Sequence, residues 1–290
     1  LGILDSIIDL SWDFPPAHFK IGVACIFFPS IFFSITITLI CELINKVKNI
    51  WISNLENKKV FVTGIFGNTL RDKYLKDHSI VVKSESDTFF YNLNKSGNLN
   101  KAYLDSLFDN KHLINEFYSP VSLDDLPFPD WAEYTKKYPL RNNFFGLSEK
   151  IAIPLLGTRG CPYSCFNYCT YPLQQGRKVR ARSVKNIIDE IKYWQKKLGT
   201  NKFVFRDPVF SINKKHTVNL CKEIIEKKLN IKFMVETHLN NLDDEMINLL
   251  SKAGLELVYV GIESADGFVL EDMKRFTIQN DKQYEIIKKC

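Results

Sequence analysis

Short apolar runs alternate with longer amphipathic segments along the second half of the chain. The runs cover 150–156, 202–205, 231–235 and 257–262, and each predicts a strand. The segments between them predict helices over 183–198, 214–228 and 243–253, and a fourth helix from near Phe268. Ser183 and Gly254 stand where helix caps are expected. This order predicts four consecutive βα units, the start of a β/α barrel or an open parallel sheet.

A similar alternation occupies the first 118 residues. It predicts strands over Lys20–Phe27, Lys59–Thr63 and Ser79–Val82, and helices over Ser30–Val47 and Asp87–Leu93. The fold class is therefore α/β, with an N-terminal doubly wound parallel (Rossmann-like) domain over 1–118. Gly64 and Gly67 form either a plain turn, the commoner case, or a turn that a ligand approaches closely. The proline-rich segment 119–149 is the predicted linker to the second domain, 150–290.

The stretch from Ile21 to Cys41 contains no charged residue and is long enough to cross a bilayer. Pro29 and Ser30 interrupt it, and no positively charged region typical of a signal peptide precedes it. We therefore expect a buried strand and a buried helix here, with a membrane span as the alternative. We expect neither a membrane nor a nucleic acid as partner.

Composition gives only limited information about the class of protein and its cellular compartment. The 290 residues carry a net charge of +6 with 45% hydrophobic residues, which is typical of a globular protein without a strongly basic surface. The seven cysteines show no paired pattern of the secreted kind, so we expect a reduced, cytoplasmic protein. The chain begins at Leu1 and stops inside a helical pattern, and we expect a fragment at both ends.

Three of the cysteines, Cys161, Cys165 and Cys169, fall within one short loop directly after the strand at 150–156. Active sites of β/α barrels are built from such loops. Three thiolates can bind three irons of a 4Fe–4S cluster and leave the fourth iron open. A zinc site, which would require a fourth ligand, and chance clustering are the alternatives.

The segment Arg159-Gly-Cys-Pro-Tyr-Ser-Cys165, with an aromatic residue before Cys169, resembles the radical S-adenosylmethionine (SAM) superfamily. Further matching segments are Arg180-Ala-Arg-Ser183, Phe205-Arg-Asp207, Val235-Glu-Thr237 and Gly261-Ile-Glu-Ser264. The resemblance covers nearly the whole chain and is closest to the branch with an N-terminal cobalamin-binding domain, including the linker Leu123–Asp130. It implies a partial radical SAM (β/α) barrel after a cobalamin-binding-like domain.

The resemblance also implies cofactors and site residues. The cofactors are a 4Fe–4S cluster on the three cysteines, SAM and cobalamin. Tyr168 would flank the adenine, Glu236 and Glu263 would face the ribose or methionine part, and Lys274 or Arg275 would pair with the SAM carboxylate. Asp207 would border the same pocket. For each glutamate the alternative is a solvated carboxylate at the end of a strand.

The chain departs from the family pattern in three respects. The family spaces its cysteines C-x3-C-x2-C, whereas three residues separate Cys165 from Cys169 here. Only four of six βα units are predicted, and the Asp-x-His-x-x-Gly cobalt-ligand motif of some relatives is absent from this sequence.

Three functions follow. The first is a cobalamin-dependent radical SAM enzyme, with a methyltransferase as its leading form. The second is a radical SAM enzyme whose N-terminal domain is a relic that does not bind cobalamin. The third is a non-enzymatic iron–sulfur or zinc module. For an enzyme, we expect a small-molecule substrate and an electron donor such as flavodoxin or ferredoxin.

Overall fold

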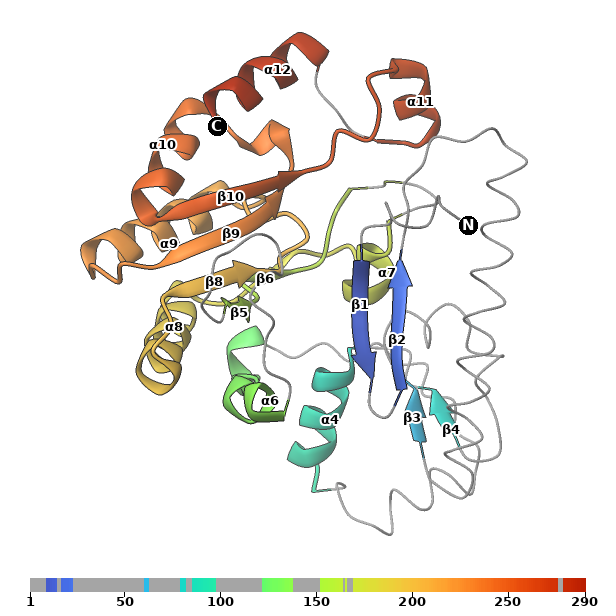
Figure 1. The fold of residues 1–290 in the computed structure, drawn as a ribbon, viewed down its shortest axis with the longest axis vertical. Helices are drawn as coiled ribbons and strands as arrows, with labels where there is room; N and C mark the ends of the chain where they lie inside the picture. The colour runs from blue at the N-terminus through green and yellow to red at the C-terminus, as the bar shows by residue number, and fades with distance from the viewer. Residues whose placement is uncertain are drawn as a thin grey trace. The chain divides into compact units, whose positions relative to one another are not determined.

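The fold is described from a computed structural model, shown in Figure 1. The described residues are 9–14, 17–22, 60–62, 79–81, 85–97, 122–137, 152–163, 165, 169–275 and 279–290. Two compact units divide the chain, Leu1–Lys58 and Lys59–Cys290. They are described separately below.

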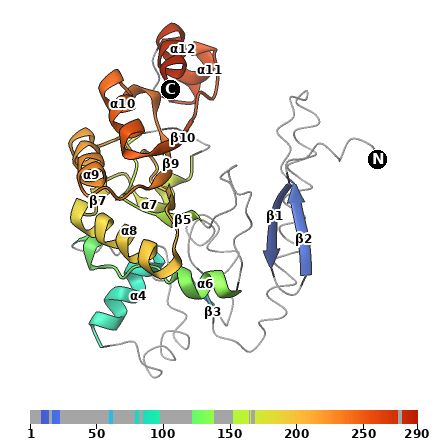
Figure 2. The ribbon, with the colours of Figure 1, turned by 60° about the vertical axis from the view of Figure 1, so that its left-hand side comes forward.

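The larger unit is built on a four-stranded parallel sheet. Its strands are β5 (Ala152–Leu155), β8 (Lys202–Phe205), β9 (Lys232–Thr237) and β10 (Leu255–Val260), in the order β10-β9-β8-β5. All three neighbouring pairs are parallel, as the sequence predicts. Helices α8 (Val184–Leu198), α9 (Lys214–Glu226) and α10 (Asp244–Ala253) form the crossovers between successive strands (Figures 1 and 2).

Alternation along the strands divides the sheet into two faces. The residues of one face pack with α8, α9 and α10 in one core cluster, which includes Ile153, Leu155, Phe203, Phe205, Phe233 and Val235. The residues between them, Val204 and Met234, form a separate small cluster with Ala152 and Leu257. We call this second side the inner face. Side chains alternate between the two faces along a strand. Arg206 follows Val204 by two residues and Glu236 follows Met234 by two, so both belong to the inner face, at the C-terminal ends of β8 and β9.

Side-chain and glycine caps set the ends of the crossover helices. The Ser183 Oγ accepts a hydrogen bond from the Asn186 amide at 3.1 Å, and Asp243 accepts one from the Met246 amide at 2.8 Å. Helix α10 ends at Gly254, whose φ is +107° and whose position leaves no room for a side chain, since a Cβ would lie 2.0 Å from the Ile231 carbonyl oxygen. The predicted caps Ser183 and Gly254 are confirmed.

The remaining elements of this unit are short. Strands β3 (Val60–Val62) and β4 (Ser79–Val81) pair in parallel, and β6 (Thr158–Arg159) and β7 (Arg180–Ala181) pair antiparallel. The helices, single-turn ones included, are α4 (Ser86–Lys95), η2 (Leu123–Asp125), α6 (Trp131–Lys137), α7 (Tyr171–Gln175), η4 (Leu239–Asn241), α11 (Gly267–Asp272) and α12 (Asn280–Lys289).

The smaller unit contains an antiparallel hairpin of β1 (Asp9–Phe14) and β2 (Ala17–Gly22). Residues 20–22, the start of the strand predicted over Lys20–Phe27, do lie in a strand. The predicted parallel pairing is not observed there, because only two residues separate β1 from β2 and a parallel pair needs a much longer crossover. The alternating sequence Asp-Leu-Ser-Trp-Asp-Phe of β1 carried a strand signal that was overlooked.

No helix among the described residues is long and apolar enough to cross a membrane. The uncharged stretch Ile21–Cys41 lies outside the described residues beyond position 22, as do Gly64 and Gly67. The strand and helix predicted there stay predictions.

Candidate functional site

The cysteine loop leaves the sheet at the C-terminal end of β5 and is closed at its base by the β6–β7 hairpin. The Cys161 amide donates to the Gly176 carbonyl oxygen at 3.1 Å, and the Gly160 amide donates to the Gln175 side chain at 3.1 Å. Gly160 has a φ of +95°, and a Cβ there would lie 2.2 Å from the Lys178 carbonyl oxygen. The loop therefore requires glycine beside its first cysteine.

The three thiols of the loop are free and interact with one another. Cys161 is buried, and burial raises the pKa of its thiol; the charges of Cys169 and Cys165 raise that pKa further. Arg275 acts in the opposite direction and also donates from its Nη1 to the Cys165 sulfur at 3.4 Å. Three free cysteines on one short loop are the donors that three irons of a 4Fe–4S cluster require, so the donor set fits a cluster.

Within the described part of the chain, no three His, Cys, Asp or Glu side chains converge closely enough to share one metal ion. A four-iron cluster instead takes one thiolate for each iron. The three cysteines of the loop could supply thiolates for three of the four irons.

Glu236 is at the centre of a polar chain that extends from the inner face to the cysteine loop. Its carboxylate forms an ion pair with Arg206 and accepts a hydrogen bond from the Tyr171 hydroxyl at 3.0 Å. Burial raises the pKa of Tyr171 to about 12, and the charges of Glu236 and Cys169 add to the shift. The Tyr171 phenol thus stays protonated at neutral pH and lies between Glu236 and the loop. Sequence reasoning missed Arg206 and Tyr171.

Glu263 and Arg275 form a second polar group at the end of β10. The Arg275 Nη2 donates to the Gly261 carbonyl oxygen at 2.7 Å and lies 3.8 Å from the Glu263 carboxylate. Glu263 has a φ of +64°. Lys274 is exposed, whereas only 11% of the Arg275 side chain is exposed, beside Cys165. Of the two cations named from the sequence, Arg275 is the one that contacts the cysteine loop; Tyr168 lies outside the described residues.

Asp207 is fully buried behind the start of the loop. Its two carboxylate oxygens accept hydrogen bonds from the Gly157 amide and the Thr158 hydroxyl, both at 2.7 Å. Burial raises its pKa to about 6, although these hydrogen bonds and the charge of Arg182 oppose the shift. In this structure Asp207 therefore fixes the turn between β5 and the cysteine loop.

The raised pKa of Asp207 predicts a pH dependence of stability. The pKa of this carboxyl is higher in the folded chain than its ordinary value of 3.8, so the folded chain binds the proton more tightly than the unfolded chain does. The resulting stabilisation is present below pH 4 and is lost as the pH rises through about 6, by at most about 3 kcal/mol. Asp207→Asn keeps an acceptor for the Gly157 amide and removes the titration. Urea unfolding of the apo-protein between pH 4 and 7 should show this loss in the wild type only. Equal pH slopes for both proteins would contradict the assignment.

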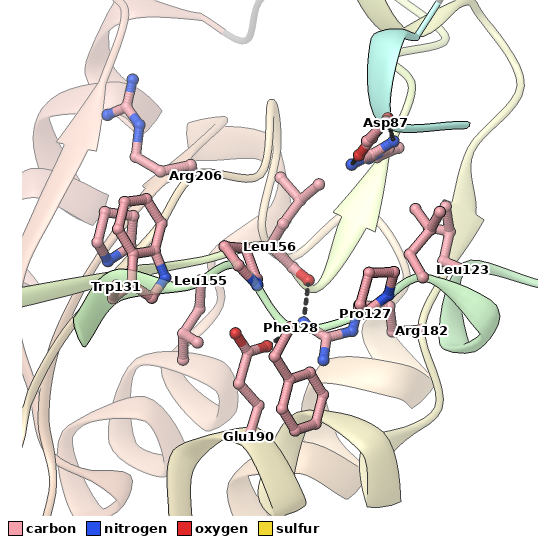
Figure 3. A pocket seen from close by; sticks show the side chains of 14 residues that line it. Asp87, Leu123, Pro127, Phe128, Trp131, Leu155, Leu156, Arg182, Glu190 and Arg206 are labelled. Atoms are coloured by element: carbon pink, nitrogen blue, oxygen red, sulfur yellow. Dashed lines mark hydrogen bonds and ion pairs between the residues drawn. The ribbon is translucent and has the colours of Figure 1, made fainter. Parts of the chain in front are cut away.

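A pocket lies where the linker crosses the start of the cysteine loop (Figure 3). It is mostly apolar, with lining residues that include Leu123, Pro127, Phe128, Trp131, Leu155 and Leu156. Two pairs of its charged side chains form ion pairs, Arg182 with Glu190 at 2.6 Å and Arg159 with Asp87. The lining residue Arg206 pairs with Glu236, which lies outside the pocket lining. Arg182 also donates to the Leu156 carbonyl oxygen at 3.0 Å. The Arg182 guanidinium also lies over the Phe128 ring, 5.6 Å from its centroid, and the Ser183 amide donates to Asp124 at 2.8 Å. These two contacts fasten the linker beside the loop.

Comparison with known proteins identifies the class to which this site belongs. Residues 155–290 match the radical SAM superfamily. This segment contains the three cysteines, Glu236, Glu263 and Arg275. This segment of the chain therefore resembles the radical SAM superfamily, as the cysteine loop predicts.

Two relatives are similar to part of this chain in sequence, and one solved structure is similar to it in fold. An uncharacterized methyltransferase of Pyrococcus horikoshii is 28% identical over 166 residues, covering 56% of this chain and 34% of the relative. The bacteriochlorophyllide d C-12(1)-methyltransferase of Chlorobaculum tepidum is 32% identical over 126 residues, covering 42% and 27%. The chain thus spans about a third of the length of these relatives.

The solved structure shows the shared fold. The cobalamin-dependent SAM radical enzyme OxsB, with aqua-cobalamin and SAM bound, superposes with a TM-score of 0.62 at 15% identity. The match covers 86% of this chain and 37% of OxsB.

Proposed function

We propose that this chain is part of a cobalamin-dependent radical SAM enzyme whose reaction is a methyl transfer to a small molecule. The observation that carries the proposal is the loop of three free, mutually interacting thiols, with acidic and basic groups at the ends of the neighbouring strands. The match of residues 155–290 to the radical SAM superfamily and the methyltransferases among the relatives support it.

In this proposal Cys161, Cys165 and Cys169 hold a 4Fe–4S cluster, and the fourth iron stays open for SAM. A bound and reduced cluster would supply the electron for the reductive cleavage of SAM. The protein's own side chains bind and orient the cofactor around that reaction.

Each of these side chains has a proposed role. Glu236 and Glu263 accept hydrogen bonds from the ribose hydroxyls or the methionine amino group, and Tyr168 stacks on the adenine. A cation pairs with the SAM carboxylate. Lys274 and Arg275 are the candidates, and the contact of Arg275 with Cys165 supports Arg275. Asp207 keeps the border of the pocket in place through Gly157 and Thr158.

The N-terminal part is proposed to be a Rossmann-like cobalamin domain over 1–118, joined by the linker 119–149 to the radical SAM core over 150–290. The parallel pairing of β3 with β4 supports a parallel sheet in this part. Bound cobalamin would supply the carrier of the methyl group. We further propose a cytoplasmic enzyme with a flavodoxin- or ferredoxin-type electron donor, and with neither nucleic acid nor membrane as partner.

Corrinoid binding tests the cobalamin part of this proposal. The full-length protein is reconstituted anaerobically with iron and sulfide, incubated with hydroxocobalamin, and separated from free corrinoid by gel filtration. About one corrinoid per chain is expected. A protein that keeps its cluster and cleaves SAM, yet retains no corrinoid and gives the same products without it, would replace this proposal by a radical SAM enzyme with a relic N-terminal domain.

A further inference from the structure

Two arginines face each other across the strands that close the cysteine loop. Arg159 of β6 and Arg180 of β7 are direct partners in the antiparallel register. Side chains of such a pair lie on the same face within about 5 Å at their Cβ atoms, and like charges there repel. Only 15% of each arginine side chain is exposed, so water screens this repulsion poorly. The hairpin therefore needs an anion between its two strands.

Glu85, 74 and 95 residues earlier in the chain, is that anion. One of its oxygens accepts hydrogen bonds from Arg159 at 2.8 Å and from Arg180 at 3.2 Å, and the other forms an ion pair with Arg180. The Glu85 side chain is 5% exposed. A single buried carboxylate thus neutralises part of both charges and bridges the two strands.

Glu85 is held in turn by the start of helix α4. The Thr88 hydroxyl donates to Glu85 at 3.1 Å, and Asp87 forms an ion pair with Arg159. Burial tends to raise the pKa of Asp87, but the hydrogen bond and charge of Arg159 outweigh it, so the pKa is lowered. Arg159 therefore keeps Asp87 as a second anion if Glu85 loses its charge, and Glu85 forms an ion pair with Arg180 as well.

The arginine pair connects directly to the cysteine-bearing segment. Arg180 donates to the Gln175 carbonyl oxygen at 3.1 Å, and the Gln175 side chain accepts from the Gly160 amide. The adjacent Cys161 amide is bonded to Gly176. Glu85 is therefore connected to the first cysteine through Arg180, Gln175 and Gly160, by hydrogen bonds between these residues and by the peptide bond from Gly160 to Cys161.

We propose that Glu85 is a positioning residue that holds the base of the cysteine loop closed by clamping Arg159 and Arg180. Through this clamp, the segment that starts α4 in the N-terminal half controls how firmly the loop holds its three thiols in place. The hydrogen bonds at the base of the loop are made by described residues, and the effect of the clamp on iron rests on the proposed function.

Amide hydrogen exchange of the apo-protein tests the clamp without any cofactor. In Glu85→Gln, exchange across 158–176 should be about tenfold faster or more, because a buried charged hydrogen bond is lost and two guanidiniums remain opposed. Exchange in α10 and α12 should not change. The matched control is Asp189→Asn, which removes an exposed ion pair with Lys185 on α8 and should leave 158–176 unaffected.

The double variant Glu85→Gln/Arg180→Gln separates electrostatic clamping from simple packing. Removing the second guanidinium leaves Arg159 paired with Asp87, so protection of 158–176 should rise above that of Glu85→Gln. It should stay short of wild type, because the hydrogen bond from Arg180 to the Gln175 carbonyl oxygen is lost as well. A double variant as unprotected as Glu85→Gln, or more so, would overturn the proposal, as would unchanged exchange in Glu85→Gln. If Glu85→Gln alone does not fold, recovery of a folded, protected loop in the double variant supports the clamp, and failure of both overturns it.

Release of iron to a chelator from the reconstituted protein is the second measurement. Loss about tenfold faster in Glu85→Gln, with partial recovery in the double variant, is expected. If amide exchange changes in Glu85→Gln but the rate of iron release does not, the clamp orders the loop only in the apo-protein. That result would overturn the proposal that the clamp governs how firmly the thiols are held. A wild type that takes up no iron would refute the proposed function, while the exchange result would still decide on the clamp.

Discussion

Replacing any one of Cys161, Cys165 or Cys169 by alanine should reduce the iron bound after anaerobic reconstitution from about four atoms per chain to well below one. The broad absorption shoulder of the cluster should disappear with it. Each thiolate is the only protein ligand of its iron in this arrangement, so the loss of one leaves a second iron open and the cluster unstable. Iron analysis and anaerobic absorption spectra measure the effect.

Cys221→Ala is the matched control for these variants. Cys221 is buried on α9 in the core cluster between the sheet and its crossover helices, and burial raises the pKa of its thiol to about 12. It is therefore a neutral packing residue, and its replacement should leave the iron content unchanged. Stoichiometric zinc without iron in the wild type, or a cluster that survives all three loop substitutions, would contradict the assignment of the loop.

Glu263→Gln should weaken SAM binding by about 10- to 100-fold while the cluster spectrum stays intact, because a hydrogen bond to a charged group contributes about 1.5–3 kcal/mol. Glu236→Gln should act in the same direction. It should also disturb Arg206 and Tyr171, which both bind the Glu236 carboxylate. SAM titration followed by the change in the spectrum of the reduced cluster measures both effects.

Glu256→Gln on β10 provides the control, since Glu256 is an exposed residue whose closest cation, Lys232, is 3.7 Å away. The SAM affinity of the Glu256→Gln protein should equal that of the wild type. Loss of cluster content in Glu263→Gln, or unchanged SAM affinity in both glutamate variants, would show that these carboxylates support the structure and do not bind SAM.

The regular elements of the second half follow from the sequence because their signals are local. The capping residues Ser183 and Gly254 and the alternation in β8 and β9 each act within a few neighbouring residues. The three cysteines are equally visible, since they lie within one loop. These features give the sheet, its crossovers and the metal-binding part of the candidate site.

The polar partners of the site were not visible in the same way. Arg206 and Glu236 are 30 residues apart, and Tyr171 and Glu236 are 65 apart, so only the parallel pairing of the strands brings them together. A usable signal existed: both charged residues continue the inner-face alternation of Val204 and Met234 at the ends of adjacent strands. Strands β6 and β7 are two residues long and form only because the loop between them closes, which no local pattern indicates.

Formation of 5′-deoxyadenosine from SAM tests the central claim most directly. The full-length protein, reconstituted anaerobically and reduced with a strong low-potential reductant, is incubated with SAM, and the products are separated by chromatography and identified by mass. We expect slow release of 5′-deoxyadenosine and methionine even without substrate, and none from Cys165→Ala. A wild-type protein with a complete cluster that neither cleaves SAM nor changes its spectrum when SAM is added would contradict the assignment as a radical SAM enzyme.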